Sequence, residues 1–170
     1  MRNLIVLDLN GAILDAAKKM ARDANNQPLP YLAKTRTKFV YLRPGAIPFL
    51  EWLLGHFDVG VWTSCIERNA RDIVNSVIPP RLRSQFKFLF HRGQCELVPG
   101  PGYKSIKDLR QVWNRFSAYG PENTYAIDDT ESKYVRQPEN LILLKEWKAD
   151  DLHDTALVGL QERLNHFLQP

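Results

Sequence analysis

The chain alternates short apolar runs with longer stretches in which apolar residues recur at the helical period. The short runs are typical of buried strands and cover 4–7, 39–42, 58–62, 86–90, 124–127 and 141–144. The longer stretches predict amphipathic helices over 47–54, 66–78, 105–116 and 152–168. Because strands and helices follow one another, the sequence predicts an α/β fold, with a doubly wound parallel sheet and helices on both faces.

Two segments do not fit this alternation. Residues 15–38 are polar and interrupted by Pro28 and Pro30, so we expect a surface loop, with a short helical piece around 16–24 as the alternative. Residues 91–102 are rich in glycine and proline and are also expected to form a loop.

Length and composition narrow the class of protein. The 170 residues suit a single domain over 1–170. Lysine and arginine number 23 against 19 acidic residues, and the basic residues are scattered, so specific nucleic-acid binding is not expected. Cys65 and Cys95 lack metal or redox spacing and are predicted to be reduced thiols. No apolar run approaches the roughly 20 residues of a membrane span. We therefore expect a soluble intracellular monomer of the nucleus or cytoplasm, with no membrane partner.

The first strand leads into a glycine turn, Asp8-Leu9-Asn10-Gly11. Strand alternation points side chains 8 and 10 the same way, at the sheet edge where ligands bind in α/β folds. Asp8 could attack phosphorus there, and a second acid two residues on would protonate the leaving oxygen. Asn10 has no titrating proton for that task. The pattern indicates a phosphoryl-transfer site that lacks one acid, or else a buried strand ending in a local turn.

Polar residues also follow two later strands. Thr63 and Ser64 could hold phosphate oxygens or could simply cap the next helix. Asp128 and Asp129 have the carboxylate oxygens that Mg²⁺ prefers, although such residues also end strands in turns. Three of these groups would meet at the carboxyl edge of a doubly wound sheet, which is where such folds place their site.

A lysine between these two strands could neutralise the phosphate and the nucleophile. Lys104 and Lys107 are both candidates on the residues alone. Carboxylate, hydroxyl, lysine and carboxylate pair then occur in that order along the chain.

With these motifs the chain resembles the haloacid dehalogenase superfamily. It is most similar to the small phosphatases of the RNA polymerase II carboxy-terminal domain, which have an NLI-interacting-factor-like domain. The resemblance spans about residues 4 to 168 and depends on Arg43-Pro44-Gly45, Val61-Trp62-Thr63-Ser64, His91-Arg92-Gly93, Lys107-Asp108-Leu109 and Ile127-Asp128-Asp129. It implies a Rossmann-like fold with only a small insertion and no large cap over the site.

The resemblance also implies roles for individual residues. Asp8 would be the nucleophile that becomes an aspartyl phosphate, and it would also bind Mg²⁺. The backbone carbonyl of Asn10 and the side chain of Asp129 would complete the protein ligands, with Asp128 close by or acting through water.

The resemblance further implies which residues would bind the phosphate. Thr63 would hold it, and Lys107, which the resemblance favours over Lys104, would bridge Asp8 and the phosphate. The family's phosphatases have an aspartate as general acid where this chain has Asn10. The resemblance therefore implies an Mg²⁺-dependent phosphatase acting on a phosphorylated protein segment and slowed by Asn10. The alternative is a catalytically impaired module that binds a phosphopeptide or protein.

Overall fold

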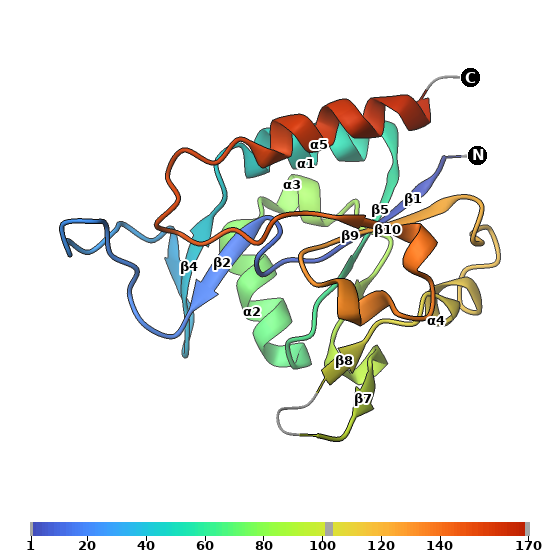
Figure 1. Ribbon diagram of the computed structural model, residues 1–170, viewed down its shortest axis with the longest axis horizontal. Helices are drawn as coiled ribbons and strands as arrows, with labels where there is room; N and C mark the ends of the chain where they lie inside the picture. Colours follow the sequence, from blue (N-terminus) through green and yellow to red (C-terminus); the bar gives the residue numbers. More distant parts are fainter. Residues whose placement is uncertain (1, 101–103, 169–170) are drawn as a thin grey trace.

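A five-stranded parallel sheet of order β10-β9-β1-β5-β6 forms the centre of the molecule (Figure 1). The computed structural model describes residues 2–100 and 104–168. The strands are β1 (Leu4–Leu7), β5 (Asp58–Trp62), β6 (Leu89–Phe90), β9 (Thr124–Asp128) and β10 (Leu141–Leu143). All neighbouring strands pair in parallel, so the predicted doubly wound sheet is confirmed.

Both faces of the sheet are covered, as the uninterrupted apolar run of β1 requires. Ile5 and Leu7 pack into one apolar cluster, whereas Leu4 and Val6 pack into another on the opposite face. The helices that cover the first face are α1 (Ala46–His56), α2 (Glu67–Val77), α3 (Pro80–Arg83) and α5 (Ala156–Asn165). In Figure 1, α1 and α5 lie side by side. The second face is covered by α4 (Arg110–Trp113) and the 3₁₀ turn η2 (Glu131–Tyr134).

The strand order places β1 at the switch point of the sheet. From β1 the chain continues to β5 and β6 on one side and later to β9 and β10 on the other. A crevice opens outside the carboxyl ends of strands where the order reverses in this way. Asp8 follows β1, Thr63 follows β5, and Asp128 ends β9. The topology thus gathers all three at one edge.

A small antiparallel sheet stands between β1 and α1. It consists of β2 (Leu14–Ala17), β4 (Phe39–Leu42) and β3 (Ala33–Lys34), in the order β2-β4-β3. The prediction of a surface loop over 15–38 is therefore wrong at both of its ends, and the helical alternative around 16–24 is wrong as well. The strand at 39–42 exists but pairs with β2 instead of joining the central sheet. Although Asp15 is polar, it is buried in β2, where its carboxylate accepts a hydrogen bond from the distant Ala149 N–H.

A second small insertion, a β-hairpin, precedes Lys107. Its strands are β7 (Glu96–Val98) and β8 (Lys104–Ile106), which follow the 3₁₀ turn η1 (Arg92–Gln94). The loop predicted over 91–102 is thus largely ordered, and its last two positions lie outside the described residues. The helix predicted over 105–116 is wrong at its start and is reduced to α4, because β8 pairs with β7 first. Both insertions are small, in agreement with the predicted lack of a large cap.

Other elements are shorter than predicted. The strand expected over 86–90 is only β6, and the last helix begins at Ala156 and ends in the 3₁₀ turn η4 (His166–Leu168). A further 3₁₀ turn, η3 (Pro138–Asn140), precedes β10. Cys65 and Cys95 are both free thiols. None of the helices in the described part of the chain has the length and apolarity needed to cross a membrane.

Candidate active site

Two buried carboxylates and one buried lysine form the centre of the site. Asp8 is 2% exposed, and its backbone N–H donates to Ile127 O of the neighbouring strand at 2.9 Å. Lys107 Nζ donates to Asp8 Oδ1 at 2.8 Å and to Asp128 Oδ2 at 2.6 Å. Since a buried charge is tolerated only when it is paired, the lysine is what allows both carboxylates to be ionised side by side.

The burial and the charges shift the pKa values of these groups. Burial raises the pKa of Asp8, against the opposing effect of Lys107. For Asp128, burial is outweighed by Lys107 and Lys133, so the pKa of that carboxyl is lowered. Burial also opposes the charge of Lys107, but Asp8 and Asp128 outweigh it and raise the pKa of the ammonium. Lys107 therefore stays protonated between the two buried carboxylates.

A second lysine, which the sequence interpretation missed, enters the site from η2. Lys133 Nζ donates to Asp128 Oδ1 at 2.8 Å and lies 3.4 Å from Asp8 Oδ2 and 3.5 Å from Asp129 Oδ1. Its position four residues after Asp129 was the available signal, because one helical turn brings side chains at that spacing together.

The acidic residues fit a hard divalent cation. Asp8, Asp128 and Asp129 each offer a carboxylate oxygen, and these atoms lie within 4.8 Å of one another. Oxygen ligands of this kind suit Mg²⁺. Gly11 has a φ of 85°, and a Cβ built there would collide with the Asp129 carboxylate. Glycine at this position therefore lets the Asp129 carboxylate approach the turn after β1 closely.

A cleft of about 350 Å³ lies above these groups. Thr63 Oγ1 accepts the Cys65 N–H at 3.2 Å, which leaves the hydroxyl proton available to a ligand. Ser64 Oγ is buried and has no hydrogen-bond partner within the described residues. The N-cap of α2 is Ile66, so the alternative role of Thr63 and Ser64 as its cap is wrong. Both hydroxyls are free to serve an anion in the cleft.

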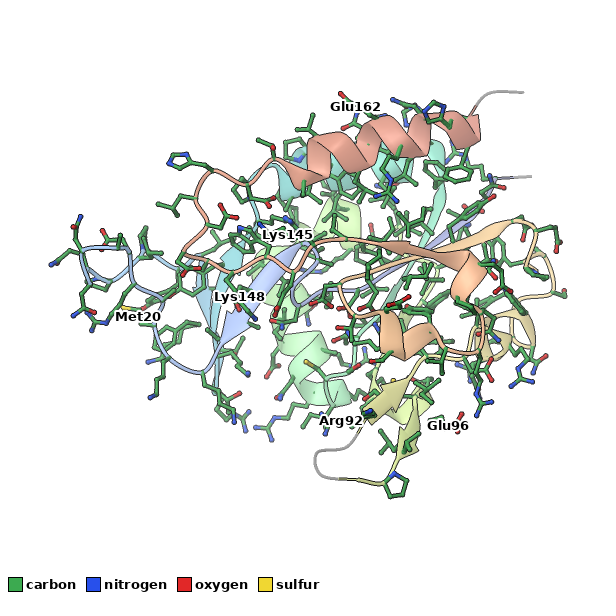
Figure 2. All side chains as sticks on the ribbon, viewed as in Figure 1. Met20, Arg92, Glu96, Lys145, Lys148 and Glu162 are labelled. Atoms are coloured by element: carbon green, nitrogen blue, oxygen red, sulfur yellow. The ribbon has the colours of Figure 1, made fainter. Side chains whose placement is uncertain are left out.

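The cleft is bordered by cationic side chains. Lys38, Arg92 and Lys133 line it, opposite the acidic residues Asp8, Asp129 and Glu146. Arg92, labelled in Figure 2, lies at the base of the β7–β8 hairpin, where its Nε donates to Ser64 O at 3.0 Å. Lys145 and Lys148, also labelled there, stand on the segment after β10. The basic side chains of the lining can attract an anionic group, while the carboxylates can hold a cation beside it.

Asn10 is fixed at the edge of the cleft by the small antiparallel sheet. Its Oδ1 accepts the Ala16 N–H of β2 at 2.7 Å. The amide NH₂ group donates to no protein acceptor within the described part of the chain. Asn10 can therefore offer a hydrogen bond to a ligand in the cleft but has no proton to transfer.

A buried ion pair holds the turn after β1 in place. Arg43 Nε and Nη2 donate to the two carboxylate oxygens of Asp154 at 2.6 and 2.8 Å. Its Nη1 donates to Ala12 O at 2.8 Å, and the Trp147 N–H donates to Gly11 O at 2.9 Å. Arg43 is thus a positioning residue, which joins the turn to the segment before α5.

The sequence-predicted residues come together in space. Asp8, Asn10, Thr63 and Asp129 line the cleft. Lys107 and Asp128 lie next to Asp8, in contact with one another. Asp128 and Asp129 also accept hydrogen bonds from the next residue along the chain, because the backbone N–H of Thr130 donates to Asp128 and its hydroxyl donates to Asp129. Lys104, the other candidate lysine, is exposed on β8 and does not line the cleft.

This fold and this arrangement define the class of the protein, a haloacid dehalogenase-like α/β protein. A haloacid dehalogenase-like hydrolase from Streptococcus pneumoniae aligns over 96% of this chain and 98% of its own, with a TM-score of 0.56 and 12% identity. The model of the NLI interacting factor-like phosphatase family matches residues 3–169, and the chain belongs to that family. The family resemblance expected from the motifs is confirmed.

Individual relatives agree with this assignment. A CTD phosphatase-like protein of Invertebrate iridescent virus 3 is 28% identical over 184 residues, covering 98% of this chain and 97% of the viral protein. The mitochondrial import inner membrane translocase subunit tim50 of Neurospora crassa is 33% identical over 119 residues, 69% of this chain and 20% of that protein. The fission yeast RNA polymerase II CTD phosphatase Fcp1 aligns with a TM-score of 0.63 and 15% identity. The chain matches 50% of that Fcp1 chain, and the likeness shows the fold.

Proposed function

We propose that the protein is an Mg²⁺-dependent phosphatase that acts on a phosphorylated protein segment. The observation that carries the proposal is Asp8, which stands at the switch point of the sheet, is paired with the buried ammonium of Lys107 and lines the cleft. Family membership supports the phosphatase assignment. The nature of the substrate, the metal dependence and the intermediate are inferred from the site.

Asp8 would act as the nucleophile. One of its carboxylate oxygens forms a bond to phosphorus while the bond to the leaving alcohol oxygen breaks, which gives an aspartyl phosphate. Thr63 and Ser64 have free hydroxyls to hold the phosphoryl oxygens, and Lys107 balances the charge from below. Attack of water then releases inorganic phosphate and restores Asp8.

The divalent cation would be held by Asp8, Asp129 and the backbone carbonyl of Asn10, with Asp128 close by. When bound, it neutralises charge on the phosphoryl group and helps to orient it. Asp129→Ala removes the carboxylate that stands beside Gly11. We therefore expect this variant to lose Mg²⁺ binding in calorimetry while it keeps its fold.

The open cleft favours a macromolecular substrate. The small sheet and the β7–β8 hairpin are the insertions among the described residues, and both are short, so a protein segment would not need a domain to open before it reaches the cleft. Lys38 and Arg92 line this cleft, and their charges would attract a phosphorylated segment. A free metabolite would remain exposed to solvent in such a cleft.

Asn10 favours a second candidate function. With an amide in place of the general acid, the site could bind a phosphorylated segment without releasing the phosphate at a useful rate. The same residues would then form a phosphopeptide-binding module. One relative, tim50, is by its name a subunit of a mitochondrial import translocase.

The test is steady-state hydrolysis of p-nitrophenyl phosphate and of phosphoserine peptides, with Mg²⁺ and with EDTA. The phosphatase proposal predicts turnover that requires Mg²⁺ and is lost in Asp8→Asn, a variant of nearly the same shape. If the wild type binds phosphopeptides and hydrolyses none of these esters, the binding module replaces the enzyme. If Asp8→Asn retains wild-type turnover, the nucleophile lies elsewhere.

A further inference from the structure

The ammonium of Lys133 occupies the acidic end of the site, where the divalent cation would bind. It donates to Asp128 Oδ1 at 2.8 Å and lies within 3.5 Å of oxygens of Asp8 and Asp129. It thus touches each of the three carboxylates that fit a metal ion. Lys107 touches only two of them.

The two lysines contact opposite carboxylate oxygens. Lys107 pairs with Asp8 Oδ1 and Asp128 Oδ2 in the buried interior. Lys133 contacts the other oxygen of each residue, Asp8 Oδ2 and Asp128 Oδ1, on the side that faces the cleft. It also reaches Asp129, which Lys107 does not contact. The oxygens of Asp8 and Asp128 that Lys107 leaves for a cation are therefore the ones that Lys133 already contacts.

We propose that Lys133 is an internal counter-ion that competes with the divalent cation for Asp8 and Asp129. An ammonium and a metal ion cannot share these oxygens without strong repulsion, because both are positive and the site is shielded from water. The inference concerns regulation of the proposed active site and rests on the metal-binding part of the proposed function.

The side chain of Lys133 has a path out of the site. It is 16% exposed and lines the cleft, whereas Lys107 is fully enclosed. Lysine has a flexible stem and a compact charge, so the ammonium can move toward the cleft without disturbing η2. Lys107 cannot leave without unpairing two buried carboxylates.

Displacement of Lys133 would link metal binding to anion binding. Once moved into the cleft, the ammonium stands where Thr63 and Ser64 would hold a phosphate. A phosphate in the cleft would stabilise the displaced position and so strengthen metal binding. By thermodynamic reciprocity, the metal would strengthen phosphate binding by the same factor.

The experiment is calorimetric titration of Mg²⁺ alone into wild type, Lys133→Met and Lys38→Met. In Lys133→Met, Mg²⁺ no longer has to displace the ammonium from its charge-assisted hydrogen bonds with the carboxylates. This variant is therefore expected to bind Mg²⁺ at least about tenfold more tightly than wild type. Lys38→Met removes the same charge from the same cleft without touching a carboxylate, so its Mg²⁺ affinity should stay close to that of wild type. Lys133→Gln, which keeps a polar group of similar length, should behave like Lys133→Met.

Two further measurements do not depend on turnover. Without Mg²⁺, the Lys133→Met protein should melt at a lower temperature than wild type, and Mg²⁺ should raise its melting temperature more than that of wild type. Inorganic phosphate should tighten Mg²⁺ binding to wild type but have a smaller effect in Lys133→Met.

The outcomes separate this inference from the proposed function. If only the Lys133 variants bind Mg²⁺, the competition is supported, and the wild type is not the Mg²⁺-dependent enzyme proposed above. If the wild type hydrolyses phosphate esters with Mg²⁺ and the Lys133 variants bind Mg²⁺ equally or more weakly, the competition is overturned and the phosphatase stands. If none of the proteins binds Mg²⁺, the competition is also overturned.

Discussion

Asn10→Asp is the substitution that restores the missing acid, and its effect should depend on the leaving group. The amide and the carboxyl have nearly the same shape. One carboxyl oxygen can keep the 2.7 Å hydrogen bond from the Ala16 N–H, so the other takes the place of the NH₂ group at the edge of the cleft. The nearby charges of Asp8 and Asp129 disfavour ionisation of a third carboxyl and so help it to hold a proton.

The expected gain follows from what the wild type lacks. A positioned general acid contributes about 10² to 10⁴-fold, and the fixed orientation at Ala16 supports at least about 10²-fold, or about 2.7 kcal/mol of barrier. A phenolate whose parent acid has a pKa near 10 leaves with little protonation. A serine alkoxide is far more basic and needs the proton. Hydrolysis of phosphoserine peptides should therefore rise by about 10²-fold, and that of aryl phosphates by much less.

The assay compares steady-state kcat on phosphoserine peptides and on p-nitrophenyl phosphate for the wild type and Asn10→Asp. Pre-steady-state traces add a second readout, because a wild type that also lacks its base should show a burst followed by slow turnover. The double variant Asp8→Asn/Asn10→Asp is the control and should be inactive. Equal gains on both classes of ester would refute the leaving-group argument, and no gain on either would remove Asn10 as the cause of slow turnover.

Two further predictions concern the supports of the site. Lys107→Met should lower the free energy of unfolding by about 3 kcal/mol in urea titrations, because Asp8 Oδ1 and Asp128 Oδ2 lose their buried partner and only Lys133 remains beside the two carboxylates; a loss below about 1 kcal/mol would contradict this. Arg43→Met should lower the free energy of unfolding by about 3 kcal/mol at neutral pH. In the acid range, the free energy of unfolding of this variant should depend less on pH than that of the wild type. Arg43 holds the pKa of Asp154 below its usual value, so the pair stabilises the fold above the unfolded pKa of about 3.9 and loses this contribution as pH falls through the lowered pKa. Unfolding curves of wild type and variant from neutral pH into the acid range check this, and parallel pH dependences would contradict it.

The central sheet and most of the candidate site could be predicted from sequence because they depend on local patterns. The apolar run before Asp8 must be buried on both faces, which requires a parallel sheet covered by helices. Once that fold is accepted, the residues at the strand ends meet without further information. Thr63 and Asp128 needed no long-range argument of their own.

The features that were missed depend on contacts between distant segments. The polarity and the prolines of 15–38 predict a loop, whereas β2 forms within it by pairing with β4, and the Ala149 N–H that satisfies the buried Asp15 lies far along the chain. The strand at β8 exists because it pairs with β7, while its own residues carry a helical period into α4. In the sequence alone, Lys133 looks like an ordinary surface lysine. Only the fold of η2 shows that its side chain points toward Asp128.

The most direct measurement of the central claim is trapping of phosphorylated Asp8. The wild type is mixed with p-nitrophenyl phosphate and Mg²⁺, quenched in acid during turnover, digested and analysed by mass spectrometry. The account predicts one phosphoryl group on the peptide that contains Asp8, released by hydroxylamine as an acyl phosphate should be, and absent from Asp8→Asn. Hydrolysis of the ester by a wild type that never has a phosphoryl group on Asp8, or that has it on another residue, would contradict the account.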